Sequence, residues 1–459
     1  MRLQREVDLL QSDLVQAVQA CIRIQSVKDR AETGAPFGLG IKQALAWTLS
    51  LGHDLGFKVK NIDGYAGHIE MGHGEEIIGI LGHLDVVPAG EGWTFPPYGG
   101  NLHEGRIYGR GALDDKGPTL AALFAMKAIL DSKYSLRKKV RLILGTSEET
   151  GEWEDLKRYE AQEGLPQAGF APDAEFPLIH AEKGILHLEL SKPAPKLKYI
   201  QEMRGGERPN IVPDSCKVSL RGIPLNIIEE KINSYSFPEE VSASAQETAG
   251  KIQLIVRGIG AHGSLPQKGK NAVNYALQFL RTLPLESSEQ ELIRWLLEHP
   301  GKSFYGEGLD LALEDEISGK LTLNLGIFEL SPAGLRVVLD IRYPVSTNGE
   351  ELIKFVKTKI ESAGLSLRVL SHQKAHHVPK DSPLVKSLLK AYADVTGFEP
   401  YAFAIGGGTY AKALAQGVAF GPVLPGEPEL IHCADEYITV DNLMLTARIY
   451  AEGILNLAL

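Results

Sequence analysis

Cysteine is scarce in this chain of 459 residues, and the scarcity excludes two kinds of framework. The three cysteines, Cys21, Cys216 and Cys433, are an odd number and lack CxxC spacing. Disulfide-held domains and thiolate zinc sites need paired or closely spaced cysteines. The sequence therefore predicts neither a disulfide framework nor a cysteine-ligated metal.

Long apolar runs and an excess of positive charge are also missing. No stretch approaches the ~20 apolar residues of a membrane span, and the formal net charge of -10 disfavours binding to nucleic acid or anionic lipid. The beginning of the chain has apolar residues at Val7, Leu10, Leu14 and Val18, a spacing typical of a surface helix rather than a signal peptide. We expect a cytoplasmic protein with no nucleic-acid partner and no membrane partner.

The composition is that of a globular protein with more than one core. Hydrophobic residues make up 44% of the chain and charged residues 23%, an ordinary balance. A chain of this length exceeds one ordinary hydrophobic core, which favours two domains. We predict a catalytic domain formed by residues 1–185 and 381–459, with residues 186–380 inserted as a second domain.

Apolar segments of strand length alternate with helical patterns in both parts of the predicted catalytic domain. Residues 77–81 and 140–144 predict buried strands, and an Ala- and Leu-rich helix begins at Pro118. Near the end of the chain, residues 442–457 predict a closing helix capped by Asp441. This alternation predicts an α/β domain with a mixed, mostly parallel sheet flanked by helices.

The pattern differs between residues 186 and 380, where β-branched strands alternate with isolated helices. Residues 216–224 precede a helical pattern at 227–232, and residues 336–344 precede another at 351–360. Repeated strand–helix units indicate an inserted α+β domain made of two similar halves, although β-α units can also resemble one another by chance.

Carboxylates and imidazoles stand at breaks in the apolar runs, and together they predict a site for two metal ions. Two histidines with three or more carboxylates suit zinc first, with manganese or cobalt as alternatives. Several of them follow predicted strands, where open α/β sheets place their ligand sites. The set consists of His83, Asp85, Asp114, Asp115, Glu148, Glu149, Asp173 and His432.

Each of these positions taken singly has a less specific interpretation. His83 with Asp85 can be a core histidine beside a solvated carboxylate, and aspartates before a helix can cap it. The Glu148–Glu149 pair can be an acidic loop, and Asp173 can be a turn residue. Their joint occurrence favours one site, in which one glutamate binds metal and the other remains free as a base.

A glycine-rich stretch at residues 258–263 fits the GxGxxG pattern but does not predict a nucleotide site. The stretch follows a strand-like run at 252–256, yet Pro266 and Gly269 stand where the required helix would begin. We therefore interpret His262 as a functional loop histidine.

Eight short stretches spread over the chain are highly specific when they are taken together. They are GHLDVVPAGEGW (Gly82–Trp93), YGRGALDDKGP (Tyr108–Pro118), GTSEETG (Gly145–Gly151), PDAEFP (Pro172–Pro177), NIVPD (Asn210–Asp214), GAHGSLP (Gly260–Pro266), DIRYPV (Asp340–Val345) and GGGTYAK (Gly406–Lys412). This set resembles the co-catalytic zinc peptidases that include carboxypeptidase G, aminoacylase, acetylornithine deacetylase and succinyl-diaminopimelate desuccinylase. Within that family the chain is most similar to the bacterial Xaa-His dipeptidases, and the resemblance covers nearly the whole chain.

The resemblance implies a ligand set for two divalent metal ions per chain. It implies that His83 and Asp173 bind one metal and that Glu149 and His432 bind the other. Asp114 would bridge the two metals, because the family pattern reads Asp-any-Lys-Gly.

The resemblance also implies roles in catalysis and substrate binding. Glu148 would be the general base, Asp85 would orient the first histidine ligand, and the inserted domain would be a lid whose His262 stabilises the oxyanion. The substrate-binding residues that it implies are Asn210, Arg342 and Gly408, of which the first two would hold the terminal carboxylate.

These expectations converge on a metal-dependent dipeptidase that hydrolyses the amide bond of dipeptides with a free amino terminus. One alternative is an N-acyl-amino-acid deacylase or desuccinylase with the same site, and another is a catalytically silent zinc-binding scaffold. The inserted domain is long enough that its second half could occupy the place that the lid of a partner subunit would take in a dimer. We therefore expect a monomer whose only implied ligands are the metals and a small peptide.

Overall fold

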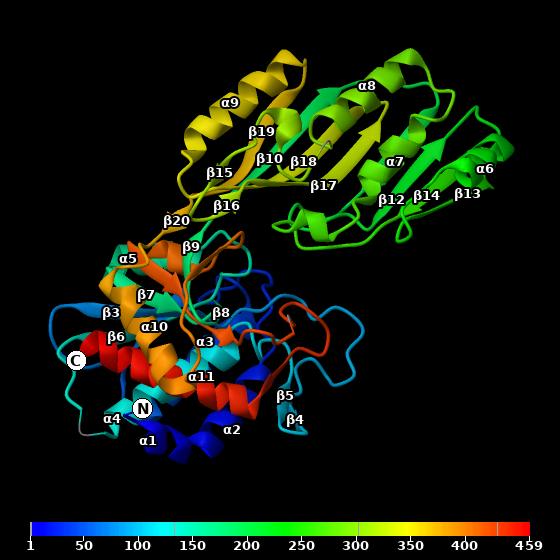
Figure 1. Cartoon of the computed structure of the whole chain (residues 1–459). Helices are drawn as coiled ribbons and strands as arrows, with labels where there is room; N and C mark the ends of the chain where they lie inside the picture. The colour runs from blue at the N-terminus through cyan, green and yellow to red at the C-terminus, as the bar shows by residue number, and fades with distance from the viewer. Residues whose placement is uncertain (1, 133, 302, 429) are drawn as a thin grey trace. The chain divides into compact units, whose positions relative to one another are not determined.

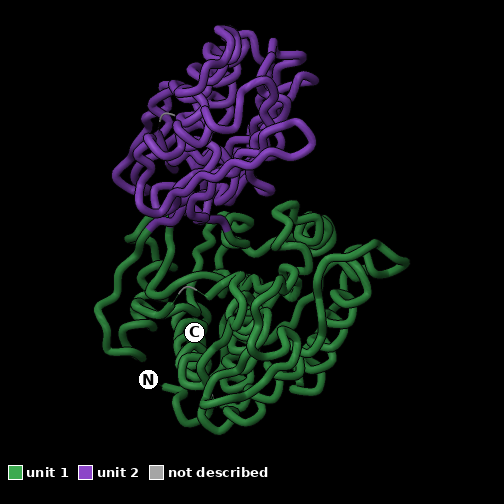
Figure 2. Tube along the Cα trace, turned by 90° about the vertical axis from the view of Figure 1, so that its right-hand side faces the viewer, with its two compact units in different colours: residues 1–180, 377–403, 409–459 green, residues 181–376, 404–408 purple. Residues whose placement is uncertain are grey.

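The chain folds into two compact units, which Figure 2 distinguishes by colour. The computed structural model describes residues 2–132, 134–301, 303–428 and 430–459. Unit 1 comprises Met1–His180, His377–Phe403 and Thr409–Leu459. Unit 2 comprises Ala181–His376 together with a short later segment, Ala404–Gly408.

The larger sheet has nine strands among the described residues, most of them in unit 1 (Figure 1). Its centre is β3 (Ile77–His83), which runs parallel to β6 (Lys139–Gly145) on one side and β7 (Ala168–Ala171) on the other. β22 (Gln416–Ala419) extends the parallel set beyond β7. Antiparallel partners flank this set, so the sheet is mixed and mostly parallel at its centre.

The strand order of this sheet is β1-β2-β6-β3-β7-β22-β9-β20, and β21 pairs with β9. The remaining strands are β1 (Lys58–Ile62), β2 (Ala66–Met71), β9 (Ile179–Glu182), β20 (His376–His377) and β21 (Phe403–Ile405). Smaller sheets in the same part of the chain use β4 (Asn101–His103), β5 (Arg106–Tyr108) and β24 (Tyr437–Thr439), and β8 (Ala174–Glu175) with β23 (Pro422–Val423).

A buried helix, α4 (Lys116–Leu130), packs at the centre of unit 1 against α2 (Gln11–Ile22) and α11 (Val440–Ala458). It is largely apolar and buried on nearly all sides, as expected for a helix enclosed by other elements. Pro118 lies in its first turn, where a missing backbone N–H is tolerated. The other helices of unit 1 are α1 (Gln4–Leu9), α3 (Leu39–Asp54), α5 (Glu154–Glu163) and α10 (Pro383–Thr396).

The closing helix begins earlier than the sequence indicated, and the predicted cap was wrong. α11 begins at Val440, and the side chain of Thr439 accepts a hydrogen bond from the amide of Asn442. Asp441 therefore lies inside the first turn, where its charge favours the helix dipole without capping the end.

Unit 2 is built on an antiparallel sheet of eight strands in the order β13-β14-β12-β11-β17-β18-β10-β19. Alternate residues of these strands share one apolar cluster with the helices, so the helices cover one face of the sheet. The strands are β10 (Gly184–Pro193), β11 (Ile200–Gly205), β12 (Ser215–Leu220), β13 (Ser242–Thr248), β14 (Lys251–Arg257), β17 (Thr322–Ser331), β18 (Gly334–Tyr343) and β19 (Ser366–Gln373). The helices are α6 (Leu225–Ser234), α7 (Ala272–Leu280), α8 (Ser287–Glu298) and α9 (Gly349–Ser362), and a two-stranded ribbon is formed by β15 (Glu314–Asp315) and β16 (Gly319–Lys320).

The eight strands form two halves of four strands each, which meet at the central β11–β17 pair. In each half the second strand continues into a helix and then into the outermost strand, as β12-α6-β13 and as β18-α9-β19. The third strand differs, because β14 follows β13 in the chain whereas β10 precedes β17. The architecture confirms the predicted α/β domain with an inserted α+β domain. No helix among the described residues has both the length and the apolar character needed to cross a membrane.

Candidate metal centre and active site

Three neighbouring strands of unit 1 end at the same edge of the sheet and deliver most of the predicted site. β6, β3 and β7 are parallel, so their carboxyl ends meet at one edge. His83 is the last residue of β3, the Glu148–Glu149 pair follows β6, and Asp173 follows β7. Ligand sites of α/β sheets form at such edges because the loops after parallel strands converge there.

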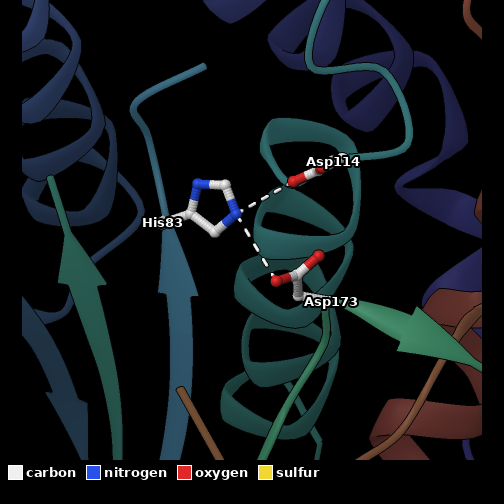
Figure 3. A group of neighbouring side chains, drawn as sticks. All are labelled: His83, Asp114 and Asp173. Atoms are coloured by element: carbon white, nitrogen blue, oxygen red, sulfur yellow. Dashed lines mark ion pairs between the residues drawn. The ribbon is translucent and has the colours of Figure 1, made fainter. Parts of the chain in front are cut away.

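The first group of candidate ligands surrounds the imidazole of His83 (Figure 3). Its Nε2 atom lies 3.0 Å from Oδ1 of Asp114 and 3.6 Å from Oδ2 of Asp173. The imidazole is fully buried, and Nε2 has no hydrogen-bond partner among the described residues. Nε2 therefore faces two carboxylates without a hydrogen bond of good geometry to either, an arrangement that a bound cation would satisfy.

The second group is formed by Asp114, Glu149 and His432. Nε2 of His432 lies 3.0 Å from Oδ2 of Asp114 and 3.1 Å from Oε2 of Glu149. Asp114 thus presents one carboxylate oxygen to each group. This arrangement is the one a carboxylate needs in order to bridge two cations.

The donor chemistry of both groups fits divalent metal ions. Within each group the ligand atoms lie within 4.8 Å of one another, and all of them are imidazole nitrogens or carboxylate oxygens. Zinc binds such donors readily, and manganese or cobalt can use them as well. The buried Nε2 of His83 makes no hydrogen bond of good geometry to the carboxylates that it faces, which adds a structural reason for a cation at the first group.

The electrostatics of the cluster also favour added positive charge. Burial and the neighbouring charge of Asp114 raise the pKa of Glu149 to about 7. Burial and the same neighbour raise the pKa of Asp173. Burial alone would lower the pKa of His432, yet hydrogen bonds to Asp114 and Glu149 raise it to about 11. These raised pKa values mean that bound protons offset the repulsion among the crowded carboxylates. Metal cations can supply the same positive charge.

Asp85 holds the end of β6 through the main chain. Its Oδ1 and Oδ2 atoms accept hydrogen bonds from the amides of Glu148 and Glu149 at 3.2 and 3.1 Å. Nδ1 of His83 lies 2.9 Å from the carbonyl oxygen of Asp85 and 3.5 Å from its carboxylate Oδ1. The backbone carbonyl of Asp85 is therefore the closer partner of the imidazole.

Glu148 belongs to neither ligand group, whereas its neighbour is held in place. Oε1 of Glu149 accepts a hydrogen bond from the amide of Val87 at 3.2 Å, which directs Oε2 to the second group. Burial, followed by the charges of nearby carboxylates, raises the pKa of Glu148 well above its ordinary value. A carboxylate of raised pKa beside a metal centre has the basicity that a general base requires.

The predicted substrate-binding residues lie together in unit 2. Asn210 accepts a hydrogen bond from the amide of Gly263 at 2.7 Å through its carbonyl oxygen, and Ile211 forms a β-bridge with His262. Nδ1 of that histidine lies 2.6 Å from Oγ of Ser264. These contacts bring the NIVPD and GAHGSLP stretches side by side.

Arg342 lies on the face of the unit 2 sheet opposite the helices, and its guanidinium is already engaged. Nε and Nη2 donate to the two oxygens of Asp340 at 2.7 and 2.8 Å, and Nη1 donates to the carbonyl of Gly406 at 2.9 Å. Among the described residues, two of its five N–H groups have no partner and remain for another one. The Gly406 contact also holds the segment that ends at Gly408.

The structure adds residues that the sequence did not single out. Oε1 of buried Glu436 accepts hydrogen bonds from the amides of Gly111, Leu113 and Asp114, and Oε2 pairs with Arg110 at 2.5 Å. These contacts fix the loop that carries the bridging carboxylate. The only sequence signal for them is an acid shortly after His432, which is too common a feature to be specific.

The fold and the site define a class of protein, namely a two-domain metallohydrolase of the α/β type. Residues 79–456 match Peptidase family M20/M25/M40, and the chain belongs to this family. The resemblance found in the sequence is thereby confirmed.

Relatives of similar length carry dipeptidase names. "Putative dipeptidase YtjP" of Bacillus subtilis (strain 168) is 40% identical over 100% of both chains. "Beta-Ala-Xaa dipeptidase" of Lactobacillus delbrueckii subsp. lactis is 34% identical and covers 97% of this chain and 96% of its own. The solved structure of di-peptidase Dug1p from Saccharomyces cerevisiae has a TM-score of 0.61 at 15% identity, covering 99% of this chain and 97% of that one, which shows the same fold.

Proposed function

We propose that this chain is a metal-dependent dipeptidase that hydrolyses the amide bond of dipeptides with a free amino terminus. One observation carries the proposal: Asp114 shares its two oxygens between the ligand groups, while Glu148 remains outside both. A site that only stores metal has no use for a further buried carboxylate next to a ligand. The dipeptidase names of full-length relatives support the same activity.

Five residues of unit 1 would hold the metals. His83 and Asp173 form one end of the centre, Glu149 and His432 form the other, and Asp114 lies between them. When two divalent metals are bound there, they supply Lewis-acid polarisation and a water of lowered pKa. Zinc suits this donor set best, with manganese or cobalt as alternatives.

Glu148 accepts the proton of the attacking water and delivers it to the leaving amine. The amide hydrogen bonds from Glu148 and Glu149 to Asp85 hold both residues in one geometry. One glutamate can therefore remain a ligand while the other moves a proton, which is the division of labour that general base catalysis needs.

Residues of unit 2 would bind the substrate. Arg342 retains two N–H groups that suit a carboxylate, and Asn210 and Gly408 belong to segments held in the same unit. His262 would donate a hydrogen bond to the oxyanion that forms during attack. We further propose a monomer in which these residues serve the site of their own chain.

A matched substrate panel tests the proposed reaction. The panel contains α- and β-alanyl dipeptides, the same dipeptides with an acetylated amino terminus, and N-acetyl and N-succinyl amino acids. We expect the free dipeptides to be hydrolysed fastest and Glu148→Gln protein to provide the inactive background. Preference for the N-acyl amino acids would identify a deacylase, and metal binding without any turnover would identify a scaffold.

A further inference from the structure

A buried carboxylate and a buried tyrosine meet beside the loop that carries the proposed base. Asp155 is 0% exposed and Tyr410 is 1% exposed, and the tyrosine hydroxyl donates a hydrogen bond to Oδ2 of the aspartate. The same oxygen accepts the amides of Thr146 and Ser147 at 2.6 and 3.0 Å. These two amides immediately precede Glu148.

Asp155 does more than stabilise its own helix. It lies in the first turn of α5, where a negative charge is favourable, and its Oδ1 accepts the amide of Leu156 at 2.8 Å. Among the described residues, Oδ2 accepts hydrogen bonds from the Thr146 and Ser147 amides and the Tyr410 hydroxyl, all of which lie outside that helix. Burying a carboxylate costs free energy unless it gains such hydrogen bonds, so the contacts with the loop amides and with Tyr410 stabilise Asp155 in its buried position.

The ring of Tyr410 fills the space between the ends of two strands. A Cβ atom placed on Gly145, the last residue of β6, would lie 2.3 Å from Cε2 of the tyrosine. The ring also meets His83 edge-on, with centroids 6.2 Å apart, and Trp153 with centroids 5.4 Å apart. Tyr410 thus packs against the last residues of both β3 and β6.

We propose that Asp155 and Tyr410 form a positioning pair that fixes the backbone of this loop and thereby sets the direction in which the side chain of Glu148 points. Asp155 takes the amides of residues 146 and 147, and Asp85 takes those of residues 148 and 149. Four consecutive amides are therefore fixed by two carboxylates. Sub-ångström placement of a base strongly affects rate, so loss of one anchor slows the reaction without removing a ligand. This inference rests on the proposed dipeptidase function.

Two conservative substitutions test the pair in the metal-loaded enzyme. Tyr410→Phe removes only the hydroxyl, and Asp155→Asn keeps the shape of the side chain but weakens its acceptor capacity. For each we expect kcat to fall about 10- to 100-fold, with KM and metal content unchanged, as is typical when a supporting partner of a metal site is lost. The double variant is expected to be no slower than the worse single variant, because the two residues act as one unit.

A tyrosine on α5, the helix that carries Asp155, provides the matched control. Tyr159 is also buried, accepts a hydrogen bond from Arg141 at 3.2 Å and lies 2.9 Å from Nδ1 of His68. Tyr159→Phe deletes a comparable buried hydroxyl away from the loop. We expect its kcat to stay within about twofold of the wild type, since it has no contact with the anchored amides.

Hydrogen exchange supplies a readout that does not depend on turnover. In both Tyr410→Phe and Asp155→Asn, the amides of Thr146 and Ser147 are expected to exchange faster than in the wild type, whereas Tyr159→Phe leaves them unchanged. Wild-type kcat in Tyr410→Phe, additive effects in the double variant, or loss of metal with activity would each overturn the positioning role. An inactive wild type would instead refute the dipeptidase function, so the two failures are distinguishable.

Discussion

The carboxylate of Asp85 accepts a hydrogen bond from the amide nitrogen of Glu149 at 3.1 Å, which ties the loop after β3 to the loop after β6. The contact fixes a metal-ligand candidate by its main chain, while Oε2 of its carboxylate is directed to the second ligand group. Both partners come from loops at the carboxyl edge of the sheet.

Asp85→Ala should slow the enzyme about 10- to 100-fold, because the residue supports two functional glutamates through their amides. Steady-state kinetics and metal content measured on the same preparation check this expectation. Asp85→Asn is the milder companion, since its amide oxygen can still accept one of the two hydrogen bonds. Equal activity of Asp85→Ala and wild type would contradict the anchoring role.

Glu148→Gln should retain the full metal content and lose nearly all turnover, because Glu148 lies outside both ligand groups. General base catalysis contributes about 10²- to 10⁴-fold, so a loss of that size is expected. Glu149→Gln is the matched control, and it should lose metal as well as activity. If Glu148→Gln remains active, another group must move the proton.

Asp114→Ala and Asp173→Ala should differ in how much metal they release. Asp114 supplies an oxygen to both groups, so its loss is expected to empty the centre. Asp173 contacts only the His83 group, so its loss should spare the metal of the His432 group. Elemental analysis after exhaustive dialysis gives the metal-to-protein ratios, and identical ratios in the two variants would argue against a shared carboxylate.

Chelation should abolish activity, and added zinc, cobalt or manganese should restore it to different degrees. The donor set consists of imidazole and carboxylate groups, which do not select strongly among these ions. Activity after dialysis against chelator, followed by titration with each metal, measures the effect. An enzyme that keeps its rate after complete metal removal would refute the metal requirement.

In the metal-free protein, His68 should contribute a loss of stability as the pH decreases from about 6.5 to about 4, opposite in sign to the contribution of Glu149, whose pKa is raised. Burial, together with the charge of Arg141, lowers the pKa of His68 from 6.5 to about 4. In this window His68 binds a proton in the unfolded state that it excludes in the folded state, so its contribution to the free energy of unfolding decreases as the pH falls. In urea unfolding, His68→Gln should therefore become more stable relative to the wild type as the pH falls through this window, whereas His53→Gln, at an exposed position, should follow the wild type.

Mixing two inactive variants tests whether His262 acts within its own chain. Glu148→Gln and His262→Ala proteins should remain inactive when combined, if the proposed monomer is correct. Size-exclusion chromatography with light scattering on the same samples gives the oligomeric state. Recovered activity would show that the histidine serves a partner's site.

Much of the site could be predicted because each of its residues lies next to a short sequence pattern that can be recognised by itself. Apolar runs of strand length located β3 and β6, and the polar residues shortly after them pointed to one sheet edge. Residue chemistry then limited the ligands to histidines and carboxylates. The strand–helix repeats in the inserted domain likewise correspond to β12-α6 and β18-α9.

The contacts that complete the site could not be predicted, because they join residues far apart in the chain. Periodicity does not reveal that Asp155 accepts the hydroxyl of Tyr410, or that Glu436 binds the loop of Asp114. The cap of α11 was misjudged for a related reason, since Thr439 and Asp441 are both acceptable by residue type and only backbone geometry chooses between them.

The sequence by itself determined the fold class, the family and the residues able to bind metal, because hydrophobic spacing and side-chain chemistry are carried by each short segment. Only the tertiary structure decided how the ligand atoms of these residues are distributed between the two groups. Asp114 gives one oxygen to His83 and the other to His432 only because the loops of unit 1 converge at one edge of its sheet. The same convergence places buried carboxylates against loop amides, since those amides need partners away from water.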